Sequence, residues 1–130
     1  MAGIFDGAAP GPTVMLRAEL DALPIEETGD VPHASTIPER GHMCGHDGHA
    51  ASLLGCAYAF ARQRPARGRV VLMFQPAEED GSGAAAVIAD PRFAELRPDM
   101  AFSWHNMPGI PLCEARLREG PMFCASVGLR

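Results

Sequence analysis

Residues 70–74, with the sequence Val-Val-Leu-Met-Phe, form a continuous apolar run of strand length. A strand that is apolar on both faces is typical of a parallel sheet covered by helices on either side. Directly after it, residues 75–79 read Gln-Pro-Ala-Glu-Glu, so two acidic side chains emerge where the run ends. The run therefore predicts a central strand that delivers polar groups to one edge of a sheet.

The segments on either side alternate between strand and helix patterns. From Asp47, a plausible N-cap, to Ala61, apolar residues that include Leu53, Leu54 and Tyr58 recur at the helical spacing of 3.6 positions. The order strand, helix, strand, helix, strand predicts an α/β fold with a mainly parallel sheet flanked by helices. The other expected elements are a turn at 7–12 after a short leader, strands at 13–20, 100–104 and 113–117, a loop at 26–43, and a helix from Ser82 to Ala89 that Pro91 interrupts.

The composition fits one globular unit. The chain has 130 residues, of which 47% are hydrophobic and 21% are charged, which is enough to bury a core. Its net charge of −5 leaves no basic stripe, so nucleic acid is not an expected partner. No run approaches the roughly 20 apolar residues of a membrane span, and the first residues show no secretory pattern. We therefore expect a cytoplasmic protein with reduced thiols and no membrane partner.

Polar residues follow each of three expected strands. Asp21 follows the first strand, Glu78 and Glu79 follow the central one, and His105 follows the next. Because ligands bind outside the carboxyl ends of the strands in open α/β sheets, these side chains should meet at one edge. A satisfied core histidine is the alternative interpretation of His105.

A dense cluster of metal-ligand side chains precedes the first helix. Residues 42–49 read His-Met-Cys-Gly-His-Asp-Gly-His, and the spacing lets Cys44 and His46 reach one site. A thiol and an imidazole near paired carboxylates are the ligand set of a divalent-metal hydrolase. A buried thiol beside a loop histidine is the alternative. His49 belongs to the same cluster, but it lies one turn into the expected helix and could instead cap or pack. His33 and His42 are expected to lie in surface loops.

The acidic pair after the central strand also has two interpretations. One glutamate would ligate a metal and the other would act as general base, although spacing alone does not order Glu78 and Glu79. Alternatively, the pair is a solvated acidic helix start that the helix dipole favours. On the first strand, Arg17, Glu19 and Asp21 share one face, where Arg17 can neutralise a carboxylate and Asp21 can orient a metal-bound imidazole.

Four ordered motifs resemble the zinc-dependent amidohydrolases of the aminoacylase and carboxypeptidase superfamily. The similarity is to the branch that holds hippurate hydrolase, auxin-conjugate hydrolases and N-acetyldiaminopimelate deacetylase. The matching segments are Leu-Arg-Ala-Glu-Leu-Asp-Ala-Leu-Pro-Ile at 16–25, Met-Cys-Gly-His-Asp-Gly-His at 43–49, Phe-Gln-Pro-Ala-Glu-Glu at 74–79 and His-Asn-Met-Pro-Gly at 105–109.

This resemblance implies hydrolysis of the amide bond of N-acyl amino acids by metal-activated water. Glu78 would be the general base and Asp21 would orient the ligands. The cofactors implied are two divalent metal ions, zinc or manganese, with cobalt or nickel as alternatives. The ligands that the resemblance implies are Cys44, His46, Glu79 and His105.

Members of that family are longer, with a lid domain and a further histidine ligand late in the chain. Residues 1–130 therefore resemble part of a metallohydrolase catalytic domain, an incomplete zinc-aminopeptidase-like domain without the lid, and we expect weak activity from this chain alone. The alternative is a non-catalytic metal-binding or interaction fragment that needs a partner chain, either in a homo-oligomer or as the missing C-terminal half. A thiol-redox function is disfavoured because no Cys-Xaa-Xaa-Cys motif is present.

Overall fold

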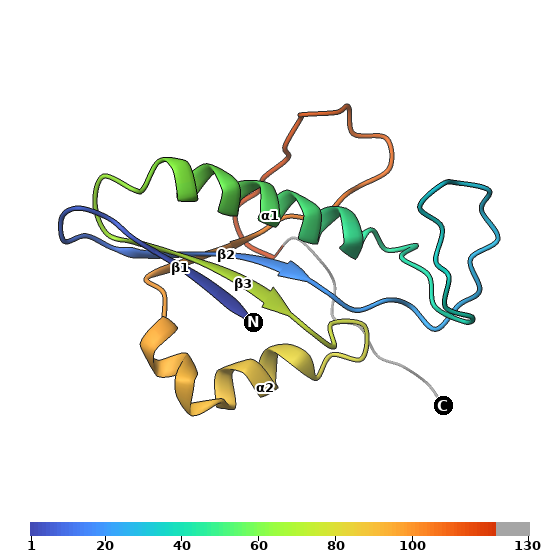
Figure 1. The fold of residues 1–130 in the computed structure, drawn as a ribbon, viewed down its shortest axis with the longest axis horizontal. Helices are drawn as coiled ribbons and strands as arrows, with labels where there is room; N and C mark the ends of the chain where they lie inside the picture. The colour runs from blue at the N-terminus through green and yellow to red at the C-terminus, as the bar shows by residue number, and fades with distance from the viewer. Residues whose placement is uncertain (122–130) are drawn as a thin grey trace.

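A four-stranded sheet organises residues 1–121, which the computed structural model describes. A long helix lies on one face of the sheet, and a short helix followed by a 3-10 helix lies on the other (Figure 1). In chain order the elements are β1 (Ala2–Asp6), β2 (Thr13–Glu19), α1 (His46–Arg62), β3 (Arg69–Gln75), α2 (Gly83–Ala89), the 3-10 helix η1 (Pro91–Leu96) and β4 (Met100–Ser103).

The strand order is β1-β3-β2-β4, so β2 and β3 occupy the centre of the sheet. The strand β2 pairs in parallel with both β3 and β4, which confirms the α/β fold with a mainly parallel sheet. The strand β1 was not expected, and it pairs antiparallel with β3 from Ala2 opposite Met73 to Asp6 opposite Arg69. The expected leader is therefore an edge strand, and the turn at 7–12 returns the chain to β2.

The two helical layers bury opposite faces of the same strands. Because side chains alternate along a strand, Leu16 and Ala18 of β2 face α1 while Met15 faces α2 and η1. Leu53 of α1 is fully buried, and burying such a side chain contributes about 1.5–3 kcal/mol. The core beneath α1 comprises Ala18, Leu53 and Leu72, packed by Phe5, Leu16, Cys56, Ala57, Phe60, Val70, Phe74 and Trp104; the opposite core comprises Met15, Val71 and Met73, packed by Ala2, Val87, Phe93 and Leu96.

The structure corrects the details of α1. Its N-cap is Gly45, in a left-handed conformation with φ of 92°, so the expected cap at Asp47 is wrong. The helix begins earlier because the left-handed turn lets the His49 backbone N–H donate to the Gly45 carbonyl oxygen. Leu54 and Tyr58 are exposed, and the sheet-facing stripe runs instead through Leu53, Cys56, Ala57 and Phe60.

Of two irregular regions, the sequence predicted one correctly and assigned the other to a strand. The segment 26–43 contains no helix or strand, as expected, and a bridge between Leu23 and Gly41 closes its base. The strand expected at 113–117 is wrong, because these residues form turns and irregular structure and Cys113 has a φ of 65°. In the part of the chain that is described, no helix has the length and apolar character that crossing a membrane requires.

Candidate metal centre

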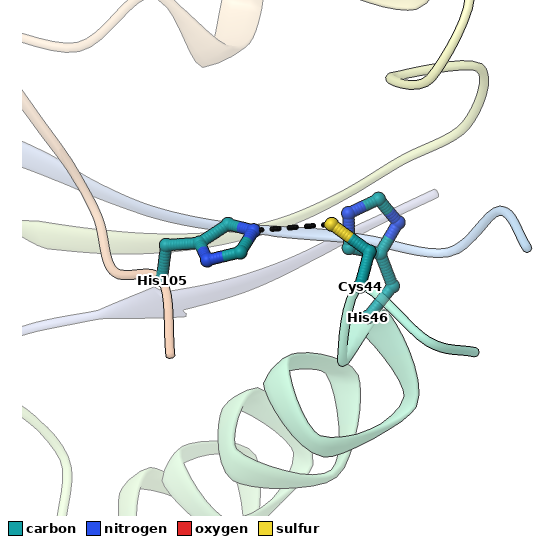
Figure 2. Close-up of side chains that lie close together, drawn as sticks. All are labelled: Cys44, His46 and His105. Atoms are coloured by element: carbon teal, nitrogen blue, oxygen red, sulfur yellow. Dashed lines mark hydrogen bonds between the residues drawn. The ribbon is translucent and has the colours of Figure 1, made fainter. Parts of the chain in front are cut away.

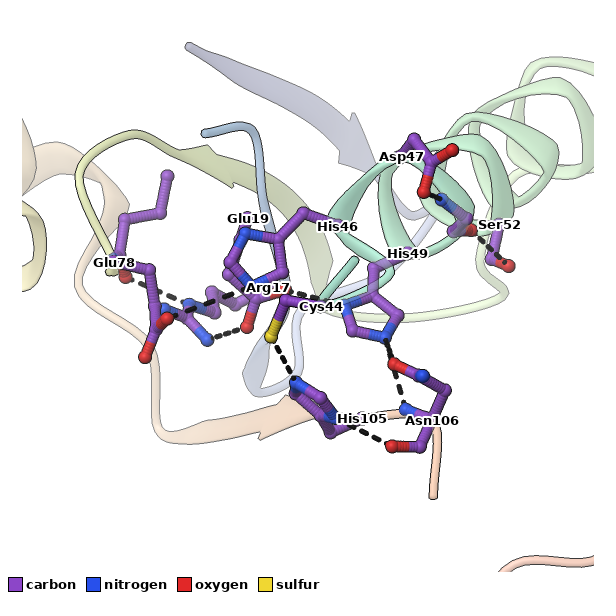
Figure 3. A network of polar contacts seen from close by, with 12 residues as sticks. Arg17, Glu19, Cys44, His46, Asp47, His49, Ser52, Glu78, His105 and Asn106 are labelled. Carbon is purple, nitrogen blue, oxygen red and sulfur yellow. Dashed lines mark hydrogen bonds and ion pairs between the residues drawn. The ribbon is translucent and has the colours of Figure 1, made fainter. Parts of the chain in front are cut away.

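The carboxyl ends of β2, β3 and β4 and the start of α1 bring the expected site residues to one edge of the sheet. The Leu20 backbone N–H donates to the Gln75 carbonyl oxygen over 2.9 Å, which extends the β2–β3 pairing to this edge. Just beyond it, the Glu79 backbone N–H donates to Asp21 Oδ2 over 3.0 Å. Figure 3 shows the side chains from these segments facing a common centre.

His46 lies at the middle of this arrangement and is 1% exposed. Its Nδ1 donates to the Asp21 carbonyl oxygen over 2.9 Å, and one Asp21 carboxylate oxygen lies 3.5 Å away. Because Nδ1 carries the hydrogen, Nε2 presents a lone pair. This buried Nε2 has no hydrogen-bond partner among the described residues, and it lies 3.7 Å from a carboxylate oxygen of both Glu78 and Glu79.

Cys44 and His105 meet beside His46 (Figure 2). The Cys44 Sγ and His105 Nε2 are 3.3 Å apart, and His105 Nδ1 donates to the Asn106 carbonyl oxygen over 2.7 Å. In this tautomer His105 Nε2 also presents its lone pair to the centre. Burial, a hydrogen bond to Glu79 and the nearby negative charges raise the pKa of the Cys44 thiol to about 11 in the metal-free chain.

A strained turn fixes the two glutamates after β3. Ala77 adopts a φ of 52°, and its carbonyl oxygen accepts the Gly83 backbone N–H over 2.8 Å at the start of α2. A Cβ on Gly83 would overlap the Pro76 carbonyl oxygen, so only glycine lets the helix approach this closely. The Glu78 side chain is 40% exposed and the Glu79 side chain is 23% exposed.

The side chains present fit a divalent cation. Three groups of three have ligand atoms within 4.8 Å of one another, and all three contain His46. The buried, unpartnered His46 Nε2 is directed into the space that these groups share, and a cation would give it a partner. The first group is Cys44, His46 and His105, the second is His46, Glu78 and Glu79, and the third is the buried set of Glu19, His46 and His49.

Polar residues behind the centre form contacts that extend beyond the expected ligands. His49 does not cap α1; it is buried, at 4% exposed, and is hydrogen-bonded to Glu19 and to the Asn106 backbone. Glu19 is buried and forms an ion pair with Arg17, as its place on the same strand face suggested. His33 is exposed, as expected, whereas His42 is half-buried and its Nδ1 has no partner among the described residues.

Comparisons with known proteins agree with this geometry. The family described as "Peptidase family M20/M25/M40" matches residues 15–119. The chain is 42% identical over 120 residues to N-acetyl-L-cysteine deacetylase of Bacillus subtilis, covering 92% of this chain and 28% of that protein. It is 43% identical over 111 residues to hippurate hydrolase of Campylobacter jejuni, covering 85% of this chain and 29% of that protein. The chain thus spans less than a third of the length of these relatives.

Solved structures show the same relationship. A crystal structure of the YXEP protein of Bacillus subtilis, described as a dinuclear metal binding peptidase from the M20 family, superposes with a TM-score of 0.76. The two sequences are 37% identical, and the superposed region covers 85% of this chain and 31% of the YXEP chain. A putative aminohydrolase from methicillin-resistant Staphylococcus aureus superposes with a TM-score of 0.73 at 35% identity, covering 82% of this chain and 28% of its own.

Proposed function

Because the chain belongs to the M20/M25/M40 peptidase family, we propose that it supplies a divalent-metal centre for hydrolysis of the amide bond of an N-acyl amino acid or a similar small amide. The observation that carries this proposal is the buried His46 Nε2, which has no hydrogen-bond partner among residues 1–121 and is surrounded by other candidate ligands. Relatives named as deacetylases and as a hippurate hydrolase support the substrate class.

The proposed ligands are Cys44, His46, Glu79 and His105, holding two ions. The dinuclear description of a similar structure supports the number of ions, and the mixed thiol, imidazole and carboxylate donors suit zinc or manganese. Cation binding at Sγ would favour the thiolate form of Cys44 and oppose the burial that keeps it protonated. We therefore expect binding to weaken as the pH falls.

The surroundings of the two glutamates support different roles for them. Glu79 is the less exposed side chain, and Asp21 fixes its backbone N–H, which suits a ligand that must not move. Glu78 is more open to solvent, which suits a general base that exchanges protons. Glu78 would accept a proton from the attacking water and pass it to the leaving amine nitrogen, while Asp21 would hold the orientation of His46. A bound divalent ion supplies Lewis acidity towards the amide carbonyl and water.

One observation favours a second candidate, a metal-binding fragment that acts only with a partner chain. All four residues of β4 are exposed, and β4 lies at the edge of the sheet, where no further strand pairs with it among the described residues. Phe102 on this strand is 53% exposed. An unpaired apolar edge is a template for association with another strand, whether from a second copy or from another polypeptide.

The metal content of the purified chain tests the main proposal. We expect zinc or manganese near stoichiometric amounts by elemental mass spectrometry, and a loss of metal in Cys44→Ala and His105→Ala. Cys113→Ala, which removes an exposed thiol outside all three ligand groups, is the matched control and should retain the metal. A wild-type chain that is folded by circular dichroism yet binds no metal would refute the centre.

The same measurement separates the two glutamates. Glu79→Gln should lose metal, whereas Glu78→Gln should keep it and lose hydrolysis of N-acyl amino acids. The opposite pattern would reverse the proposed roles. A metal-loaded wild-type chain that hydrolyses no N-acyl amino acid alone, but does so with an added partner chain, would favour the second candidate.

A further inference from the structure

A line of hydrogen bonds runs behind the candidate metal centre, from β2 through α1 to the segment after β4 (Figure 3). Glu19 at the end of β2 is 2% exposed, and one of its carboxylate oxygens accepts from His49 Nδ1 over 3.0 Å. On the other side of the imidazole, Nε2 accepts the Asn106 backbone N–H over 3.1 Å. It also lies 2.8 Å from Asn106 Oδ1, a contact that becomes a hydrogen bond when the side-chain amide turns to present its NH2 group to Nε2. Arg17 completes the line by pairing with the other Glu19 oxygen.

Asn106 connects this line to both halves of the centre. Its backbone carbonyl oxygen accepts from His105 Nδ1, which sets the direction in which His105 Nε2 points. Its side-chain amide lies close against Gly45, the residue between Cys44 and His46. A Cβ added to Gly45 would lie 2.6 Å from Asn106 Oδ1. Asn106 therefore touches the turn that carries two candidate ligands while it orients a third.

We infer that Glu19, His49 and Asn106 are positioning residues that hold His105 against the Cys44–His46 turn before any metal binds. This inference rests on the proposed metal centre. The buried Glu19 carboxylate requires Nδ1 to carry the hydrogen of His49, and that tautomer leaves Nε2 to accept from Asn106. His105 itself is exposed and follows an edge strand. Its position therefore depends on Asn106, which is held by its hydrogen bond to His49.

The competing explanation is that these residues only fill space beneath α1. Ordinary packing would make His49 variants lose stability and would leave the metal affinity of the folded fraction unchanged. A positioning role predicts that Asn106→Ala also weakens binding, although Asn106 is exposed and its truncation opens no core cavity. Removal of groups that orient metal ligands typically lowers metal affinity about 10- to 100-fold.

The first test uses the metal-free, full 130-residue chain. Hydrogen exchange of the Asn106 backbone amide, followed by NMR, should show protection in the wild type and loss of that protection in His49→Phe. Ser52→Ala, whose hydroxyl donates to the Gly48 carbonyl oxygen on the exposed side of α1, is the control and should not change the Asn106 amide. Equal exchange in the wild type and in His49→Phe would overturn the inference whether or not the chain binds metal.

The second test measures Co(II) binding by titration of the visible and thiolate charge-transfer absorption bands. Asn106→Ala and His49→Phe should each raise the Co(II) dissociation constant about 10- to 100-fold and reduce the thiolate band. The double variant should be hardly weaker than either single variant, because both break one connection. Leu53→Ala destabilises α1 away from the centre and should bind Co(II) like the wild type once folded.

The outcomes separate this inference from the proposed centre. Wild-type Co(II) affinity and an unchanged band in both variants would overturn the positioning role and leave the metal centre intact. A folded wild-type chain without Co(II) binding would overturn both. If His49→Phe does not fold, Asn106→Ala decides the question, and its wild-type affinity would then be the refuting result.

Discussion

Replacement of Gly45 by alanine tests how tightly the turn between Cys44 and His46 is built. Gly45 has a φ of 92°, and a non-glycine residue in the left-handed region costs about 1–2 kcal/mol. The new Cβ would lie 2.6 Å from Asn106 Oδ1, and relieving that overlap should displace Asn106 and break the bond from its backbone N–H to His49 Nε2, which is worth about 0.5–1.5 kcal/mol. We expect Gly45→Ala to lower the free energy of unfolding by about 1.5–3.5 kcal/mol.

Urea unfolding of the metal-free chain, followed by far-UV circular dichroism, measures this loss. Gly55→Ala in the middle of α1 is the matched control, because its Cβ would meet nothing within 4 Å and its φ is not positive. That substitution should raise stability by about 0.5–1 kcal/mol through the better helix propensity of alanine. In an Asn106→Ala background, Gly45→Ala should lose only the backbone cost of about 1–2 kcal/mol. Equal stability of Gly45→Ala and Gly55→Ala would refute the reasoning.

Three further substitutions probe the surroundings of the centre. Arg17→Met leaves the buried Glu19 carboxylate without its cation. It should lower the free energy of unfolding, measured in urea, by about 3–5 kcal/mol. A loss below about 1 kcal/mol would show that the ion pair is solvated. Gly83→Ala forces a Cβ into a backbone carbonyl oxygen and should displace the glutamate turn, seen as reduced metal content; wild-type content would contradict the close approach. Glu79→Gln removes a cause of the raised Cys44 pKa and should speed iodoacetamide labelling of this thiol at pH 8 in the metal-free chain. Because the folded pKa of Cys44 is about 11 against an ordinary 9.0, stability from this group is present below pH 9 and lost between pH 9 and 11, which pH-dependent unfolding can check.

Much of the fold could be predicted because its central strands are strongly apolar. The runs at 70–74 and 13–20 match β3 and β2 within a residue or two, and 100–104 matches β4. The strand β1 could not be read from local pattern because its place is fixed by pairing with β3, a contact between residues that lie about 70 positions apart. The apolar residues at 113–117 lack such a partner strand among the described residues.

The candidate site, like the fold, could be predicted from the sequence only in part. Asp21, Glu78 and His105 follow strands, so the topology alone predicted that they would meet, although their roles remain predictions. The contact between Glu19 and His49 joins residues 30 positions apart, and the contact between His49 and Asn106 joins residues 57 positions apart. No spacing rule predicts such contacts, because they depend on which way α1 is rotated on the sheet.

The long separation between the candidate ligands also sets when the centre can form. Cys44 and His105 are 61 positions apart, and Asp21 contacts Glu79 across 58 positions. Contacts of this kind form late in folding, because the loops between them must close first. A bound ion should therefore slow unfolding and leave the refolding rate nearly unchanged. During synthesis, the chain could not hold the ion through Cys44 and His105 together until His105 has left the ribosome and β4 has paired with β2.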